Sequence, residues 1–302
     1  MIRLENVSKY YKTKTGQFCA VKDLNMEIQR GSLVGLIGPN GAGKSTTIKM
    51  MVGILTPTSG DIQVCGMVPY KNRGKLAYKI GVMFGNRTNL LFQLPLKESV
   101  LLIRDMYSIR NEDFQKSLSY YAEILEAGNL LEKPIRSMSL GQRIKSEILV
   151  TLLHEPEILV LDEPTIGLDI IARQNFRKIL RTLSNEEKKT IILTSHDLVD
   201  VENTCDEVLL INKGEIFRNF NRESFKHEIG KFAVINVPST VILSDDLKQF
   251  LRESNDMRQK LMVDRGDVNT IIQGLNSINN DVLEYEISAP SLEDIVYEDY
   301  KS

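Results

Sequence analysis

Short runs of β-branched and aliphatic residues recur along the first two thirds of the chain, separated by stretches with helical spacing. The runs predict strands at residues 32–37, 61–65, 79–84, 158–162, 190–195 and 207–212. Strands that alternate with helices in this way are typical of an α/β fold built around a largely parallel sheet.

From about residue 96 the apolar positions take on the period of helices, and they keep it to about residue 155. Two amphipathic faces result, one formed by Val100, Ile103, Met106 and Tyr107 and the next by Leu118, Tyr121, Ile124 and Leu125. Successive amphipathic helices predict a helical subdomain at about residues 88–155, inserted in the α/β core and packed mainly on itself.

The last third of the chain has a different pattern. A predicted hairpin turn at residues 213–215 is followed by a more polar stretch at 222–230, which predicts a domain boundary near residue 220. Beyond it we expect strands at 232–237, 261–264 and 282–287 and helices at 247–253, 268–275 and 292–300. The predicted organisation is therefore a core domain of residues 1–220 and a small α+β accessory domain of residues 221–302.

The most specific motif is Gly-Pro-Asn-Gly-Ala-Gly-Lys-Ser-Thr at residues 38–46, between an apolar strand and a helical pattern. It fills every fixed position of a phosphate-binding P-loop, and the strand–loop–helix context is the one this loop requires. Lys44 supplies a positive charge for the β/γ-phosphates, and Ser45 offers a hydroxyl to Mg²⁺. The predicted nucleotide-binding residues of this loop are Gly38, Asn40, Gly41, Gly43, Lys44, Ser45 and Thr46.

A second element of a phosphate site is an apolar strand that ends in Asp162 and Glu163. With the P-loop expected on a neighbouring strand, Asp162 is placed to hold Mg²⁺, directly or through water. Glu163 can orient and deprotonate an attacking water. One carboxylate for the metal and one for the water form a sufficient minimal set for phosphoryl transfer.

Composition and charge narrow the classes of partner. The 302-residue chain has a formal net charge of −2, so no global basic excess favours nucleic acid. Three widely spaced cysteines favour a reducing compartment over disulfides or zinc. The N-terminus shows no signal-peptide pattern and no apolar run is long enough to span a bilayer, so we expect a cytoplasmic protein without direct membrane insertion.

A third element follows at residues 137–143, Ser-Met-Ser-Leu-Gly-Gln-Arg. Ser139 is placed to cap an amphipathic helix, and a capped N-terminus beside a glycine is suited to an anion. With the order of motifs, this segment makes the chain resemble the nucleotide-binding subunit of ABC transporters, whose signature is Leu-Ser-Gly-Gly-Gln. Ser139, Gly141 and Gln142 match that signature, whereas Met138 and Leu140 depart from it.

The resemblance covers roughly residues 1–220 and assigns further roles by position. It implies that Tyr11 stacks on the adenine ring, with Tyr10 as the alternative. Asp169 matches the defining residue of the D-loop, and His196 matches the switch histidine that touches the γ-phosphate. His154 and His227 are expected to be incidental.

One position departs from the family. Where the family has the Q-loop glutamine, which contacts Mg²⁺ and senses the membrane partner, this chain has Gly85-Asn86. Asn86 is the candidate substitute, both for the nucleotide and for the metal, and a plain turn residue is the alternative. The following residues, 89–95, carry large apolar groups in the region that meets the coupling helix of the permease in the family.

The resemblance implies that two cassettes face each other head to tail, with each ATP between one P-loop and the other Ser139-Leu140-Gly141-Gln142 segment. It implies an ATPase that binds ATP and Mg²⁺ and powers transport, most like bacterial ABC-2 type exporters. The expected partners are a second copy and an integral membrane permease, which would hold the chain on the inner face of the membrane. The alternative is a soluble ABC ATPase that acts in DNA repair or translation. The transported substrate and the role of residues 221–302 stay open.

Overall fold

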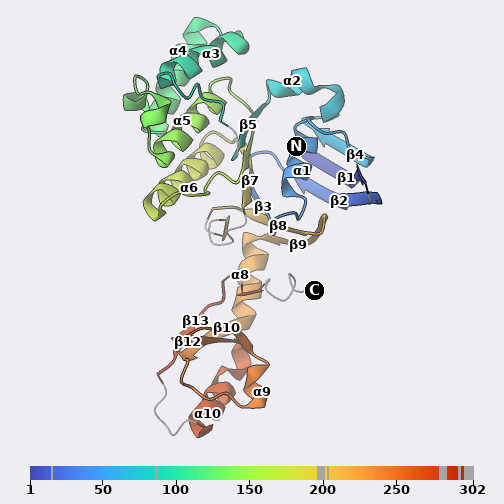
Figure 1. Ribbon diagram of the computed structural model, residues 1–302, viewed down its shortest axis with the longest axis vertical. Helices are drawn as coiled ribbons and strands as arrows, with labels where there is room; N and C mark the ends of the chain where they lie inside the picture. The colour runs from blue at the N-terminus through green and yellow to red at the C-terminus, as the bar shows by residue number, and fades with distance from the viewer. Residues whose placement is uncertain are drawn as a thin grey trace. The chain divides into compact units, whose positions relative to one another are not determined.

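A computed structural model describes residues 1–14, 16–85, 88–195, 201–202, 204–278, 284–291 and 294–295. The chain divides into two compact units, Met1–Asn219 and Phe220–Ser302 (Figure 1). Among the helices in the described ranges, none combines the length and apolarity required to cross a bilayer.

The first unit is built on a six-stranded sheet of order β5-β6-β7-β3-β8-β9. Its strands are β3 (Leu33–Ile37), β5 (Ile80–Phe84), β6 (Ile158–Asp162), β7 (Thr190–Ser195), β8 (Glu207–Asn212) and β9 (Glu215–Asn221). The pairs β5–β6, β6–β7, β7–β3 and β3–β8 are parallel. Strands β3, β6 and β7 are buried along their whole length, as expected for the centre of a parallel sheet. The α/β fold with a parallel sheet is thus confirmed.

A second sheet in this unit is antiparallel and has the order β2-β1-β4. Its strands are β1 (Ile2–Thr13), β2 (Gly16–Ile28) and β4 (Ser59–Val64). The sequence analysis did not predict β1 and β2, and in β1 register shifts interrupt the alternation of apolar and polar residues. The helix α1 (Lys44–Met51) packs with residues of both sheets in one hydrophobic core.

The helices of the first unit lie on both sides of the parallel sheet. In Figure 1, α5 (Leu140–Leu152) and α6 (Ile170–Asn185) lie on one side and α1 lies on the other. The helices α3 (Leu96–Met106) and α4 (Asn111–Ile124) lie beyond α5, and α2 (Arg73–Ala77) precedes β5. Short 3-10 turns occur at Pro69–Lys71, Gly128–Leu130 and Ile135–Ser137. Of the predicted apolar face, Val100 is buried, whereas Met106 is 64% exposed.

The second unit contains α8 (Arg222–Lys231), β10 (Phe232–Pro238), α9 (Asp245–Lys248), β11 (Leu251–Ser254), β12 (Arg258–Asp264), α10 (Val268–Ile278) and β13 (Glu286–Ser288). A 3-10 turn at Arg265–Asp267 precedes α10. The sheet order is β11-β12-β10-β13, with antiparallel pairs throughout. From β10 onwards, this order of strands and helices is that of a ferredoxin-like split βαβ arrangement. Its core lies between the sheet and the helices α9 and α10.

Three elements expected in the second unit differ from the structure or lie partly outside the described residues. The helix expected at 247–253 is wrong, because α9 ends at Lys248 and residues 251–254 form β11. The side chain of Asn255 accepts hydrogen bonds from the amides of Met257 and Arg258, which closes a β11–β12 hairpin in place of a helix. Most of the helix expected at 292–300, and the start of the strand expected at 282–287, lie outside the described residues.

Candidate active site

The P-loop connects β3 with α1 and passes close to the backbone of two other strands. Gly43 has a φ of 109°, and a Cβ there would lie 2.6 Å from the carbonyl oxygen of Ala20 in β2. A Cβ on Gly38 would lie 2.1 Å from the carbonyl oxygen of Ile211 in β8. Both positions therefore require glycine, because the backbone of the loop packs directly against these two strands.

Lys44 begins α1 and is only 6% exposed. Its ammonium donates hydrogen bonds to the carbonyl oxygens of Gly38 at 2.6 Å and Pro39 at 3.3 Å. It also lies 3.4 Å from Oε1 of Glu163. The chain thus holds a buried positive charge across the P-loop and beside the second acid, without help from a partner.

Asp162 is the last residue of β6 and is 8% exposed. Its Oδ1 accepts hydrogen bonds from the hydroxyls of Thr194 at 2.6 Å and Ser45 at 3.3 Å. We expected the P-loop strand, β3, to lie beside β6. This expectation is wrong, because β7 lies between β3 and β6. The groups still meet, since the carboxyl ends of parallel strands reach the same edge of the sheet.

The pair of Ser45 and Asp162 fits Mg²⁺. A hydroxyl and a carboxylate within 3.3 Å of each other supply the hard oxygen ligands that this ion prefers. Among the described residues there is no cluster of three or more His, Cys, Asp or Glu side chains able to hold a metal. One protein carboxylate accords with the way Mg²⁺ is usually bound, with substrate phosphates and water completing the shell.

Glu163 follows the strand in a left-handed conformation with a φ of 54°. Its amide donates to the carbonyl oxygen of Thr194 at 3.2 Å and to the hydroxyl of Thr194 at 2.9 Å. This turn lets two consecutive acids serve one site, with Asp162 toward Ser45 and Glu163 toward Lys44. Thr194 holds both acids, and the sequence analysis missed it, although a polar residue near the end of a buried strand was a usable signal.

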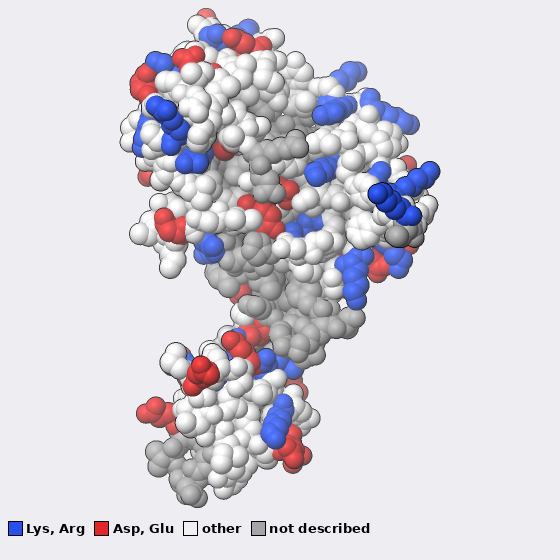
Figure 2. Space-filling view, in the orientation of Figure 1, with Lys and Arg blue, Asp and Glu red and all other residues white. Residues whose placement is uncertain are grey.

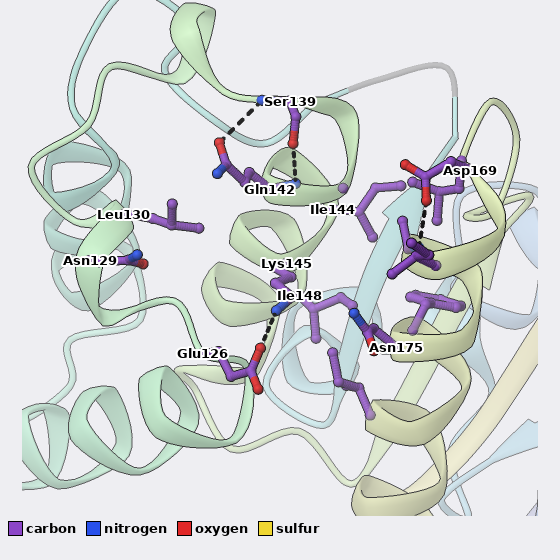
Figure 3. Close-up of a pocket in the computed structure, with 16 residues that line it drawn as sticks. Glu126, Asn129, Leu130, Ser139, Gln142, Ile144, Lys145, Ile148, Asp169 and Asn175 are labelled. Carbon is purple, nitrogen blue, oxygen red and sulfur yellow. Dashed lines mark hydrogen bonds and ion pairs between the residues drawn. The ribbon is translucent and has the colours of Figure 1, made fainter.

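Ser139 caps α5 in a full capping box. Its hydroxyl accepts from the amide of Gln142 at 3.3 Å, while Oε1 of Gln142 accepts from the amide of Ser139 at 3.2 Å. The ammonium of Lys133 donates to the same Oε1 at 2.8 Å. Figure 3 shows this cap at the edge of a cavity of about 520 Å³ between α5 and α6. The predicted cap is therefore present, at an exposed helix N-terminus.

Asp169 caps α6, where Oδ1 accepts from the amide of Ala172 at 2.8 Å. The turn before Asp169 packs on the start of α5, because a Cβ on Gly167 would lie 3.1 Å from Cδ2 of Leu140. Exposed isoleucines surround this junction, namely Ile166 at 54%, Ile170 at 76% and Ile171 at 72%. Such an apolar group in solvent suits a partner surface.

The site residues fall into two groups. Lys44, Ser45, Asp162 and Glu163 meet at the sheet edge, whereas Ser139, Gly141, Gln142 and Asp169 line the cavity between α5 and α6. Within the described part of the chain, no hydrogen bond or ion pair joins Lys44, Ser45 or Asp162 to Ser139, Gln142 or Asp169. One chain therefore presents two separate groups of candidate site residues.

The remaining predicted residues are less defined. Tyr11 lies on β1 and is 36% exposed, with the ammonium of Lys9 5.4 Å from its ring centroid. Tyr10, the alternative, is 37% exposed, and a hydrogen bond with Cys19 raises its pKa. Asn86 and His196 lie outside the described residues.

Gly85 makes a backbone contact at the position of the Q-loop. Its amide donates to the carbonyl oxygen of Asp162 at 2.8 Å, and an added Cβ would lie 2.8 Å from that oxygen. A side chain does not fit there, so any side-chain substitute for the glutamine must come from another residue.

A fixed P-loop, two acids at the carboxyl edge of a parallel sheet and an inserted helical subdomain define a P-loop ATPase. Residues 21–166 match the family model described as ABC transporter. The chain belongs to the ABC transporter family, and it is an ATP-binding subunit of that family.

Two relatives and one solved structure illustrate the similarity. The ABC transporter ATP-binding protein NatA of Bacillus subtilis is 32% identical over 216 residues, which cover 72% of this chain and 87% of NatA. The bacitracin transport ATP-binding protein BcrA of Bacillus licheniformis is 31% identical over 232 residues, covering 77% and 73%. A dimeric ATP-binding cassette bound to ADP and Pi in a post-hydrolysis state has a TM-score of 0.65 at 26% identity, covering 73% and 98%.

Proposed function

We propose that two copies of this chain bind two ATP molecules head to tail and use their hydrolysis to power export through a separate membrane permease. The observation that carries this proposal is the division of the site into two half-sites. The P-loop half consists of Lys44, Ser45, Asp162 and Glu163, and it is closed by buried hydrogen bonds such as that between Thr194 and Asp162. The signature half consists of Ser139, Gly141, Gln142 and Asp169, and it is open at the N-terminus of α5. The P-loop half supplies the lysine and the two acids, and the signature half supplies a helix N-terminus for the phosphate.

In the P-loop half, Lys44 and the loop amides bind the triphosphate, and Tyr11 stacks on the adenine. Ser45 and Asp162 hold Mg²⁺, which supplies charge neutralisation for the phosphates when it is bound. Glu163 orients the attacking water and takes its proton as the water oxygen bonds to the γ-phosphorus. The bond from that phosphorus to the bridging oxygen then breaks, and ADP and phosphate leave. His196 and Asn86 are proposed to contact the γ-phosphate and the metal.

In the signature half, the N-terminus of α5 binds the γ-phosphate of the ATP held by the partner copy. A helix N-terminus attracts anions through its free amides and its dipole. Asp169 and the exposed isoleucines beside it contact the partner copy. Hydrolysis therefore requires the dimer, whereas binding of ATP at the P-loop does not.

The proposed contact with the permease is the segment of residues 89–95. Phe92 and Leu94 are 44% and 45% exposed. Their carbonyl oxygens accept hydrogen bonds from the amides of Arg136 at 3.0 Å and Ile135 at 3.1 Å, just before the signature cap. A push on this segment would reach Ser139 through a short backbone connection. Such docking would keep the protein on the cytoplasmic face of the membrane, with residues 221–302 as an accessory domain.

The substitution Glu163→Gln tests this function. It removes the base while keeping a side chain of the same shape, so ATP hydrolysis should fall by roughly 100- to 10,000-fold. ATP binding should persist, and light scattering should detect a dimer that accumulates only with ATP and Mg²⁺. Normal turnover in the variant would rule out Glu163 as the base, and a monomer at saturating ATP would rule out the shared site.

A further inference from the structure

Glu147 is a buried carboxylate that the mechanism above does not use. It lies in the middle of α5 and is 6% exposed. It accepts hydrogen bonds from the hydroxyl of Thr88 and from the amide of Asn89, the latter at 3.0 Å to Oε1 and 3.3 Å to Oε2. Burial raises the pKa of Glu147, and the bonds from Thr88 and Asn89 act against this rise.

The partners of Glu147 belong to the segment that follows β5. The hydroxyl of Thr88 also accepts from the amide of Leu90 at 3.0 Å, and the side-chain amide of Asn89 donates to the carbonyl oxygen of Val82 at 3.2 Å. One carboxylate of the signature helix thus organises the start of the proposed permease contact.

The same segment is also attached to Asp162, at the residue where the chain leaves β5. The amide of Gly85 donates to the carbonyl oxygen of Asp162 at 2.8 Å. Three peptide units join Gly85 to Thr88, and they span at most roughly 11 Å when fully extended. The helix α5 therefore cannot move far from Asp162 while both attachments persist.

We propose that Glu147 is a positioning residue that ties the signature helix to the loop after β5, so that the Asp162–Gly85 contact and α5 move as one unit. This inference rests on the proposed function, and it gives that function a physical link where the chain lacks the Q-loop glutamine. A backbone contact at Gly85 and a carboxylate on α5 take over the linking role.

Hydrogen–deuterium exchange of the full chain, with and without a non-hydrolysable ATP analogue, tests the link. In Glu147→Leu, exchange at residues 88–91 should rise at least about tenfold, since Asn89 loses its acceptor. Analogue affinity should stay within about twofold, and kcat for ATP should fall about tenfold with little change in KM. Glu147→Gln keeps an acceptor oxygen, so exchange at residues 88–91 and kcat should both stay close to the wild-type values.

Two further variants separate this role from general packing. Thr88→Val removes one partner without altering α5, and it should raise exchange at residues 88–91 less than Glu147→Leu does. Glu126→Gln weakens an exposed ion pair between Glu126 and Lys145 of α5. It should change neither the exchange at residues 88–91 nor kcat.

Wild-type exchange and wild-type kcat in Glu147→Leu would overturn the proposal. So would equal loss of protection throughout α5 in the Leu and Gln variants, because this would mean that Glu147 only packs. The outcome is independent of the dimer that Glu163→Gln should form. If no such dimer forms, the shared site fails, yet exchange still reports whether Glu147 holds the loop.

Discussion

The two proposed half-sites of this chain differ in how much of their structure is complete within one subunit. At the P-loop, the charges face partners of the same chain, and Lys44 and Asp162 are less than a tenth exposed. At the signature helix, the cap is formed but Ser139 and Leu140 are exposed, and isoleucines surround Asp169 in solvent. The contrast supports the proposal that folding prepares the P-loop for ATP binding, whereas hydrolysis requires the assembled dimer.

The surface charges also differ between parts of the molecule. Figure 2 shows lysine and arginine side chains gathered over the edge that carries the antiparallel sheet, while acidic and basic side chains are interspersed over the helical subdomain. The formal net charge of the whole chain is nevertheless −2, so this basic edge is a local feature.

The largest expected effect is that of a negative charge placed in the signature half. Ser139→Asp keeps a residue that caps helices well but places a negative charge where the partner's γ-phosphate would lie. We expect ATP hydrolysis to fall at least about 100-fold, while ATP binding by the isolated chain changes by less than about twofold. Steady-state ATPase assays and equilibrium titration measure the two quantities. Ser137→Asp, two residues earlier, is the matched control and should retain activity.

Lys44→Ala should also abolish ATP hydrolysis, but unlike Ser139→Asp it should weaken ATP binding by the isolated chain, because it removes the buried charge of the P-loop half. Binding of a fluorescent ATP analogue to the isolated chain should weaken roughly 10- to 100-fold. Lys49→Ala, on the same helix, should bind normally. Equal binding by the Lys44 variant and the wild type would mean that the loop amides alone hold the nucleotide.

A smaller effect is expected from Thr194→Val, because Thr194 is fully buried and acts only by holding Asp162 and the amide of Glu163. The loss of its hydroxyl leaves Asp162 and the amide of Glu163 short of a partner. Turnover should fall roughly tenfold, and chemical denaturation should show a loss of about 1–3 kcal/mol. Thr190→Val, at the other end of β7, removes a hydrogen bond from the amide of Gly31 and should lower stability alone.

The smallest effect on turnover is expected at His154, which stacks on Tyr107 with ring centroids 4.1 Å apart. Burial lowers the pKa of His154 from 6.5 to about 4. The unfolded chain therefore takes up a proton that the folded chain refuses, so stability should fall as the pH drops from 6.5 to 4, by at most about 3 kcal/mol. His154→Phe should lose less stability over that range, as measured by denaturation at several pH values. At pH 7 its turnover should stay within about twofold of wild type.

Local motifs and long-range packing were not equally predictable. The P-loop, the two acids and the cap at Ser139 depend on adjacent residues, so the sequence analysis located them within their elements. The insertion of β7 between β3 and β6 depends on strand order, which no local pattern encodes. The helix expected at 247–253 failed because Leu251 and its neighbours pair with β12 across a hairpin.

Glu147 shows the limit most clearly. In the sequence it is one acid among the apolar residues of an amphipathic helix, and no residue near it in the sequence indicates its hydrogen-bond partners. Its role depends on Thr88 and Asn89, which are 59 and 58 residues away along the chain. A buried acid at an apolar position of a helix was the only signal available.

Mixing two inactive variants tests the shared site most directly. Lys44→Ala has an intact signature half, and Ser139→Asp has an intact P-loop half. In a head-to-tail dimer of one with the other, one of the two sites is built from intact halves only. Random pairing should then restore roughly a quarter of the wild-type ATPase activity per chain, although each variant alone is inactive. If the mixture shows only the average of the two variants, each site is complete within one chain and the account is wrong.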